Sequence, residues 1–194
     1  MSRDDDNKLD KAIVKEGVSR GFKTVAGFLW RSDGDRFDTI IASTVNRRNR
    51  ITYLIKQKKM SYDDLFWDIM GMHSNRNERM SLRANGAFAS PSYTIEHGQI
   101  ENVIPFTPES VSALVDRLES SLSFFTQTHL DLSRYITDHP DHALNNEELR
   151  CLAYLDMGDI DGARQLALAN LGNEGFANEG KGFFERLLLI YGGV

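Results

Sequence analysis

Histidine, which binds metals and transfers protons near neutral pH, occurs five times in this sequence. The closest approach to a metal-binding pattern is His139 and His142, which are three residues apart. Pro140 lies between them and breaks the helix that would place both imidazoles on one face. No third ligand lies close by in the sequence. We therefore predict no metal site, and no motif indicates another cofactor.

Paired carboxylates, which can act as general acid and base, occur in three places that have simpler explanations. Asp33 and Asp35 flank the glycine of a predicted hairpin turn. The other two pairs begin predicted helices, where the helix dipole favours acidic side chains; they are Asp63 with Asp64 and Glu147 with Glu148. The sequence has no nucleophile elbow, Walker loop or HExxH motif. We predict that the protein is not an enzyme, while a site assembled from distant segments would leave no such local pattern.

The chain has the features of a cytoplasmic protein. Its one cysteine, Cys151, cannot form an intrachain disulfide, and we expect an inert thiol on the buried side of a helix. No apolar run approaches the roughly 20 residues that cross a bilayer. The acidic, polar start of the chain is unlike a signal peptide. We expect no membrane association.

Charge is divided unevenly along the 194 residues. Residues 1–97 carry 17 basic and 13 acidic side chains, a net charge of +4, whereas residues 98–194 carry 6 and 15, a net charge of −9. An acidic surface attracts basic partners and repels nucleic acid. The acidic residues of the second half either form such a surface or only solvate the helices, and both readings stay open.

Hydrophobic periodicity predicts a helix over residues 6–19, followed by a change of period from 3.6 to 2. The new period indicates an antiparallel meander over residues 22–56, with turns at 33–35 and 46–49. A helix with Ser61 as its N-cap follows. Further strands are expected at residues 80–84, 92–96 and 100–104, the last two joined by a turn at His97 and Gly98.

The most strongly patterned helix begins at Thr107, the predicted N-cap before Pro108, and runs to about residue 129. Leucines and small alanines recur at helical spacing in the C-terminal part. The run from Leu152 to Arg164 resembles one tetratricopeptide-type helix pair. A final helix is expected at residues 183–191.

These elements predict an α+β fold with an N-terminal helix, an antiparallel meander sheet with packed helices, and a C-terminal helical extension. We place the α+β domain at residues 1–140. The helical extension, residues 141–194, is expected to pack on it as part of one structural unit.

Acidic side chains of the C-terminal helices and one tryptophan are the candidate partner-binding residues. Trp30 lies on a strand beside a polar hairpin, where we expect it to be half exposed, and tryptophan is favoured at protein interfaces. Acidic side chains on the helices would speed association with a basic partner. The candidates besides Trp30 are Glu147, Glu148, Asp156, Asp159 and Asp161.

Basic clusters at residues 47–50, 56–59 and 76–83 support an alternative reading. They could bind a phosphate backbone, and nearby aromatic residues could stack bases. The net charge of −5 and the lack of a known nucleic-acid motif argue against this reading. Basic residues also protect strand edges from pairing. Nucleic-acid binding is therefore the second hypothesis.

The order of the N-terminal elements resembles a bacterial domain family of unknown function. In that family a helix leads through a Gly-Phe-x-x step into a strand with an aromatic–Arg pair, and then into an antiparallel sheet; Gly21-Phe22-Lys23 and Phe28-Leu29-Trp30-Arg31 match these features. Members often end in an acidic, alanine-rich helix pair, which residues 152–171 resemble. Such domains occur beside polymorphic toxins, and the family offers no catalytic residues to carry over.

The resemblance implies an immunity protein that binds a cognate bacterial toxin, such as a nuclease with a basic surface, and occludes its active site or substrate cleft. The alternative is a nucleic-acid-associated accessory protein that uses the basic N-terminal half. The patterns do not determine an oligomeric state.

Overall fold

The change of hydrophobic period along the chain corresponds to a change from helix to sheet in the computed structural model, which describes residues 3–45, 49–84, 89–101, 106–143, 146–173 and 177–192. Within these ranges the chain has eight α-helices and one five-stranded antiparallel sheet, which confirms the α+β class. Two compact units each combine two stretches of chain: residues 1–57 with 94–130, and residues 58–93 with 131–194. The domain boundary predicted at residue 140 stays a prediction.

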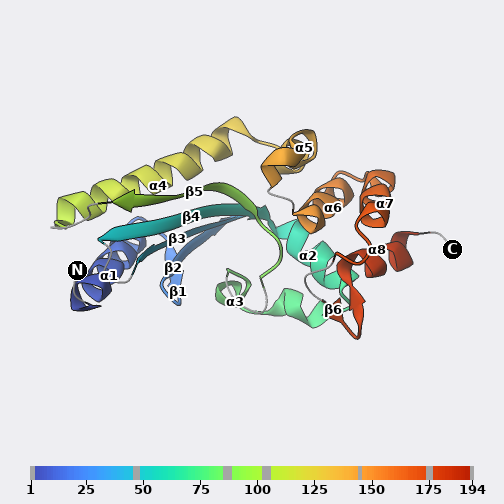
Figure 1. Cartoon of the computed structure of the whole chain (residues 1–194), viewed down its shortest axis with the longest axis horizontal. Helices are drawn as coiled ribbons and strands as arrows, with labels where there is room; N and C mark the ends of the chain where they lie inside the picture. The colour runs from blue at the N-terminus through green and yellow to red at the C-terminus, as the bar shows by residue number, and fades with distance from the viewer. Residues whose placement is uncertain are drawn as a thin grey trace. The chain divides into compact units, whose positions relative to one another are not determined.

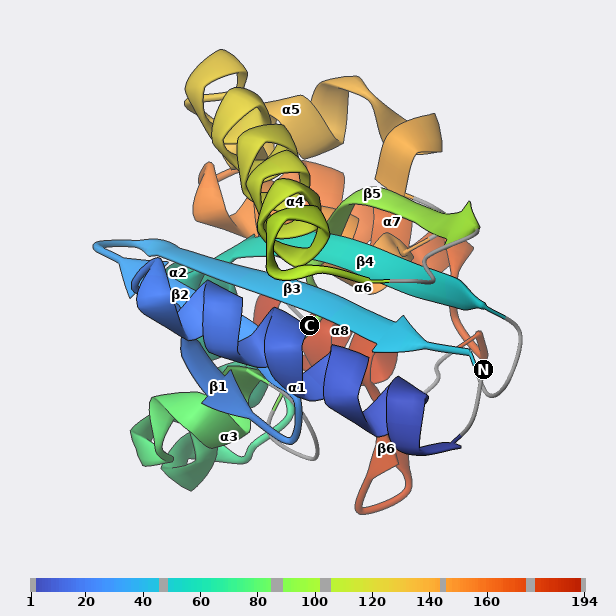
Figure 2. The same ribbon diagram turned by 90° about the vertical axis from the view of Figure 1, so that its left-hand side faces the viewer.

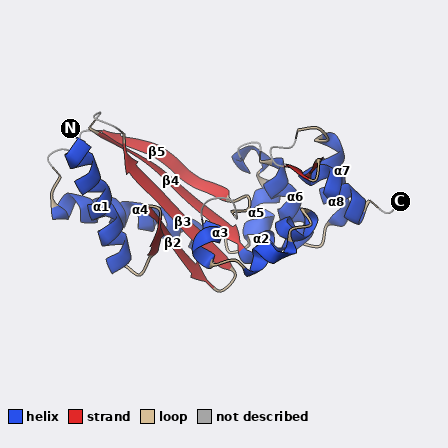
Figure 3. Ribbon diagram, turned by 90° about the horizontal axis from the view of Figure 1, so that it is seen from below, coloured by secondary structure: helices blue, strands red, loops and turns tan. Residues whose placement is uncertain are grey.

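The first unit contains the sheet and two long helices. The strands lie in the order β1-β2-β3-β4-β5, so the predicted meander is confirmed for the first four (Figure 1). Figure 3 shows the larger strands side by side in red. The elements are α1 (Arg3–Ser19), β1 (Lys23–Val25), β2 (Phe28–Asp33), β3 (Arg36–Thr44), β4 (Arg50–Lys59), β5 (Tyr93–Glu101) and α4 (Pro108–Thr128).

Local signals set several boundaries as predicted. Asp33 pairs with Arg36, so β2 and β3 join through a two-residue turn in which Gly34 has a φ of 57°. Thr107 caps α4, because its side chain accepts a hydrogen bond from the Ser110 backbone while the Ser110 hydroxyl accepts one from the Thr107 backbone. The turn predicted at residues 46–49 lies mostly outside the described residues.

Both long helices pack on one face of the sheet and on each other, and Figure 2 looks onto this pair. Gly17 allows the close approach of α1, since a Cβ atom at this position would overlap the Leu29 side chain of β2. The buried side chains that join helices and sheet are Leu9, Ile13, Phe22, Leu29, Ile40, Ala42, Ile51, Tyr53, Ile55, Val111, Val115, Leu118 and Leu122.

The second unit is helical. Helix α2 packs against α6 and α8, and α5, α6, α7 and α8 pack in sequential pairs. Tyr62, Trp67, Leu152 and Phe183 are among the side chains it buries. Its elements are α2 (Met60–Ile69), the 3₁₀-helix η1 (His73–Asn77), α3 (Met80–Ala84), α5 (Leu132–Asp138), the 3₁₀-helix η2 (Pro140–Ala143), α6 (Glu147–Asp156), α7 (Ile160–Ala169), the two-stranded ribbon β6 (Ala177–Asn178) and β7 (Lys181–Gly182), and α8 (Phe183–Tyr191).

Three local predictions are wrong. Residues 80–84 form a helix rather than a strand, and the Arg83 side chain turns inward to Asp63. Ser61 does not cap α2, which begins one residue earlier. β5 continues straight through Gly98, where a Cβ atom would lie 2.7 Å from the hydroxyl oxygen of Tyr53. That glycine therefore serves a close contact and not a turn. Residues 102–104 of the next predicted strand lie outside the described residues.

Candidate partner-binding surface

The turn between α6 and α7 is built as its sequence predicts. Gly158 ends α6 with a φ of 79°, and the Asp159 backbone donates to the carbonyl of Tyr154 at 2.9 Å. Asp159 then caps α7 by accepting a hydrogen bond from the Gly162 backbone at 2.8 Å. Small buried residues allow the two helices to approach closely, since Cys151 and Ala163 are both fully buried. The turn is therefore held rigidly by its own backbone.

This turn exposes apolar and acidic side chains together. Met157 and Ile160 are each 44% exposed, and the acidic residues beside them, Asp159 and Asp161, are exposed as well. We call these four residues the α6–α7 corner. Asp161 has Arg164 as a neighbour at 3.5 Å and remains largely in solvent. The corner can bury apolar surface and attract a basic group at the same time.

The other acidic candidates have internal partners. Glu147 pairs with Arg150 at 2.6 Å, and Glu148 is half-buried. The two carboxylate oxygens of Asp156 accept hydrogen bonds from Lys59 at 2.5 Å, and from Ser61 and Ser133 at 2.6 Å each. Asp156 therefore stabilises the fold of the second unit, and its charge is not available to a partner as that of Asp159 and Asp161 is.

Burial of Asp156 is offset by those hydrogen bonds. Burial alone would raise its pKa, but donation from Lys59, Ser133 and Ser61 outweighs that effect and lowers the pKa below its ordinary value. The carboxylate is thus ionised at neutral pH and paired with the Lys59 ammonium.

Trp30 is buried, so the expectation of a half-exposed side chain is wrong. It is 5% exposed, its ring stacks on Phe37 with centroids 5.5 Å apart, and the Lys23 ammonium lies 5.1 Å above it. The tryptophan belongs to the first unit, whereas the acidic candidates belong to the second. Its part in partner binding stays a prediction that its burial does not support.

The basic clusters of the first half are largely paired with carboxylates. Arg50 lies 2.6 Å from Glu101, and Arg76 lies 2.9 Å from Asp68. Lys58 and Arg83 are buried beside Asp63. Arg47 and Arg48 lie outside the described residues. Much of the positive charge that the sequence places in clusters is therefore neutralised within the fold.

Sequence reasoning missed the buried cluster around Asp63, a fully buried residue. One of its oxygens accepts from the Lys58 ammonium at 2.5 Å and from the Ser90 hydroxyl, and the other accepts from Arg83 at 2.6 Å. Lys58 also donates to Ser90 at 3.2 Å. These hydrogen bonds join Lys58, Asp63, Arg83 and Ser90 within the second unit and so hold these segments together. Alternation in β4 would place Lys58 on the outer side with Thr52 and Lys56, so the local pattern gave no signal for its burial.

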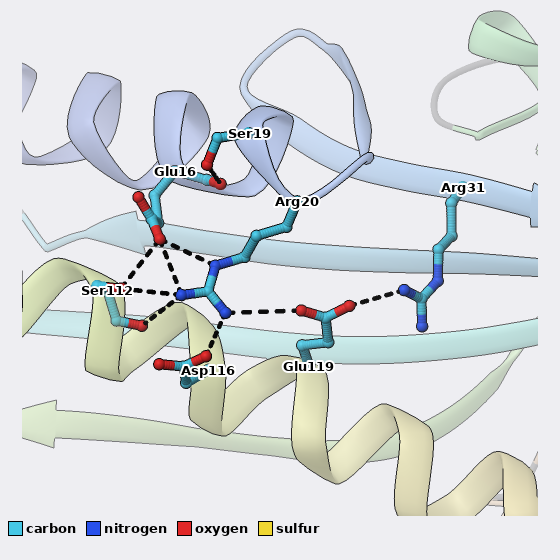
Figure 4. Close-up of polar contacts among 7 residues, drawn as sticks. All are labelled: Glu16, Ser19, Arg20, Arg31, Ser112, Asp116 and Glu119. Atoms are coloured by element: carbon cyan, nitrogen blue, oxygen red, sulfur yellow. Dashed lines mark hydrogen bonds and ion pairs between the residues drawn. The ribbon is translucent and has the colours of Figure 1, made fainter.

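A second missed cluster surrounds Arg20 at the end of α1 (Figure 4). Its guanidinium donates to Glu16 at 2.8 Å, to the Ser112 hydroxyl at 2.9 Å and to Asp116, and it lies 3.7 Å from Glu119. Hydrogen bonds from Arg20 lower the pKa of Glu16 and of Asp116. Both carboxylates are therefore ionised near neutral pH. The hydrogen bonds from Arg20 to Ser112 and Asp116 join the end of α1 to α4.

The histidine side chains within the described residues have ordinary local contacts. His73 pairs with Asp68 at 2.7 Å, and His139 stacks on Tyr135. The His142 side chain lies outside the described part of the chain. Within that part, no group of three or more His, Cys, Asp or Glu side chains is placed to hold a metal ion. Likewise, none of the described helices is long and apolar enough to span a membrane.

Comparison with known proteins does not assign the chain to a family. Set against protein-family models, curated proteins and solved structures, the chain gives no significant match. The resemblance to a toxin-associated family therefore stays a prediction. What this chain does has to be argued from its own geometry, as an α+β protein with a mixed acidic and apolar corner.

Proposed function

We propose that this protein is an immunity protein, which binds a toxin domain with a basic surface and occludes its active site or substrate cleft. The observation that carries the proposal is the α6–α7 corner, where Met157 and Ile160 are exposed beside Asp159 and Asp161. Apolar side chains exposed together on a rigid turn are typical of a surface that another protein covers.

The acidic side chains that are buried or clustered elsewhere in the described chain differ from those of the corner. Asp63, Asp156 and the carboxylates around Arg20 each have cationic partners within the fold. Asp159 and Asp161 keep their charge at the surface. An acidic group at the surface raises the rate of encounter with a basic cleft, and buried apolar contacts then slow dissociation.

The apolar and the acidic side chains of the corner are expected to make different contacts in the complex. Met157 and Ile160 would enter the apolar part of the partner's surface and supply most of the affinity. Asp159 and Asp161 would face lysines or arginines of a cleft that otherwise binds nucleic acid. The backbone of the corner is already ordered, so little conformational entropy is lost on binding.

The test is co-expression with the product of the neighbouring gene, scored by growth rescue and by pull-down. We expect the wild type to protect, and we expect the double variant Met157→Ala/Ile160→Ala to bind at least about tenfold more weakly. Leu130→Ala, a change at an exposed leucine of the first unit, is the matched control. If the wild type does not protect, or if the corner variant binds as tightly as the control, the proposal is wrong.

The alternative, nucleic-acid binding through the basic half, has less support. Arg50, Lys58 and Arg83 are already paired with carboxylates, which leaves fewer cations for a phosphate backbone. Binding of that kind would weaken steeply as salt increases. A mobility shift with DNA or RNA at low salt, lost at physiological salt, would revive this alternative.

A further inference from the structure

Helix α8 is apolar on more than one side. Phe183, Phe184 and Leu187 point into the second unit and are buried. On the outer side Leu189 is 67% exposed and Ile190 is 53% exposed. Large aliphatic side chains exposed side by side on a helix are often covered by another molecule. The outer side of α8 therefore lacks a cover within the described part of this chain.

Helix α7 extends the same apolar surface. It packs against α8, and Arg164 of α7 donates to the carbonyl of Gly192 at 3.0 Å. Leu168 and Leu171, three residues apart, are each about half exposed. Leu171 also lines a hollow of about 360 Å³ together with residues of β7 and α8. The other residues lining the hollow are Lys181, Glu185, Leu188 and Leu189.

We propose that this surface, the α7–α8 face, binds a second copy of itself in a two-fold symmetric dimer. The face consists of Leu168, Leu171, Leu189 and Ile190, with Lys181 and Glu185 at the hollow. The end of a stacked helical array needs a polar cap to remain in water, and the outer side of this one is apolar.

The charges at the hollow select a second copy over a strongly charged partner. Lys181 and Glu185 are both exposed and of opposite sign, so the rim has no net charge. A two-fold axis brings the surface against its own copy, so every contact between two different residues occurs twice in the interface. Lys181 would meet Glu185 of the partner subunit, and each leucine would meet an apolar surface. A basic partner would be repelled by Lys181, and an acidic partner would be repelled by Glu185.

The size of the face predicts a modest affinity. Stable interfaces bury about 800 Å² on each partner, and four half-exposed aliphatic side chains supply only part of that area. The dimer should therefore depend on concentration, with a dissociation constant on the order of 10 μM. Leu168 and Leu171 lie near the C-terminal end of α7, whereas the α6–α7 corner lies at its N-terminal end, and dimerisation does not rest on the proposed toxin binding.

The direct test is the mass of the full chain in solution, measured by sedimentation equilibrium from about 1 μM to about 1 mM. We expect the mass to rise from 22.0 kDa to twice that value. Leu189→Asp should remain monomeric throughout, with an unchanged circular dichroism spectrum, because the side chain is exposed. Leu130→Asp, at a similarly exposed leucine of the first unit, should dimerise as the wild type does. A wild type that stays monomeric at every concentration overturns the proposal.

A charge exchange tests the arrangement of the dimer. K181E or E185K alone places like charges together and should weaken dimerisation about tenfold, whereas K181E/E185K together should restore it. Glu185 also accepts a hydrogen bond from the Gly182 backbone at 3.3 Å, so thermal melts must accompany each measurement. A double variant that dimerises no better than the folded K181E single variant overturns the two-fold arrangement.

Discussion

Two clusters of arginine and carboxylate, one in each unit, differ chiefly in how much water reaches them. Around Arg20 in the first unit the carboxylates of Glu16, Asp116 and Glu119 are partly or largely exposed. Around Asp63 in the second unit the carboxylate is fully buried, and Lys58 and Arg83 are nearly so. Both clusters are held by several ion pairs and hydrogen bonds, yet we expect their contributions to the stability of the fold to differ.

This difference in exposure to water determines what each cluster contributes to stability. Exposed pairs gain little, because water and salt screen them and ordering long side chains costs entropy. A buried charge that loses its partner is left in a poorly polarisable interior, so the whole arrangement has to form together. The Asp63 cluster should therefore select one packing of the second unit, whereas the Arg20 cluster only adjusts how α1 meets α4.

The largest expected effect follows from Asp63→Asn, which leaves Lys58 and Arg83 buried without an anion. We expect the free energy of unfolding to fall by about 3–5 kcal/mol, measured by urea denaturation. Asp64→Asn is the matched control, since its side chain is 55% exposed and lies 3.5 Å from Arg83, and it should change stability by less than about 0.5 kcal/mol. A loss of under about 1 kcal/mol for Asp63→Asn would contradict the contrast between the two clusters.

A smaller effect is expected from Asp156→Asn, which weakens three hydrogen bonds, one of them from the Lys59 ammonium. Removing a partly buried, charge-assisted network of this kind should cost about 2 kcal/mol at pH 7. Asp161→Asn, at a largely exposed carboxylate, is the control and should have little effect.

The pH dependence of the Asp156 contribution has a definite sign. Its pKa is lower in the folded protein than in the unfolded chain. The stabilisation is therefore complete above the unfolded value of about 3.9 and is lost as the pH falls through the folded pKa. Urea titrations between pH 7 and pH 3 should show the stabilities of wild type and Asp156→Asn converging at acid pH. A stability difference that stays constant with pH would show that it does not come from ionisation of Asp156.

A still smaller effect is expected from Arg20→Gln in the exposed cluster. The melting temperature should fall by no more than about 4 °C. The difference should shrink in about 1 M salt, where charges on the surface are screened. Arg134→Gln, which removes a longer and more exposed pair with Asp138, should have no measurable effect. A loss as large as that of Asp63→Asn would mean that exposure does not separate the two clusters.

The smallest perturbation of the second unit is a chemical probe, which changes no residue and reports the exposure of one thiol. Burial raises the pKa of the Cys151 thiol to about 12, with Glu147 nearby adding to the shift. The folded protein should therefore not react with a thiol-specific disulfide reagent at pH 8, while one thiol per chain should react in concentrated urea. Reaction of the folded protein at the rate of a free thiol would show that the second unit opens readily.

Local rules predicted much of the fold correctly. The Asp33–Gly34 hairpin, the cap at Thr107 and the stop at Gly158 depend on a few consecutive residues, and each forms where its pattern placed it. Of the candidate site, Asp159 and Asp161 lie exposed on a helix start, as their spacing implied. Met157 and Ile160 were missed, because at helical spacing an apolar residue normally points into the core.

The sequence by itself determined the α+β class, the N-terminal helix followed by the meander, and turns such as those at Gly34 and Gly158, since hydrophobic period and turn chemistry act over short distances. Only the tertiary structure decided that Lys58 and Trp30 are buried and that Gly98 lies within a strand. Each of those outcomes depends on a partner distant in sequence: Arg83 beside the Asp63 that holds Lys58, Phe37 stacked on Trp30, and Tyr53 against Gly98. A polar or aromatic side chain is buried only where folding supplies a partner, and no local pattern contains that information.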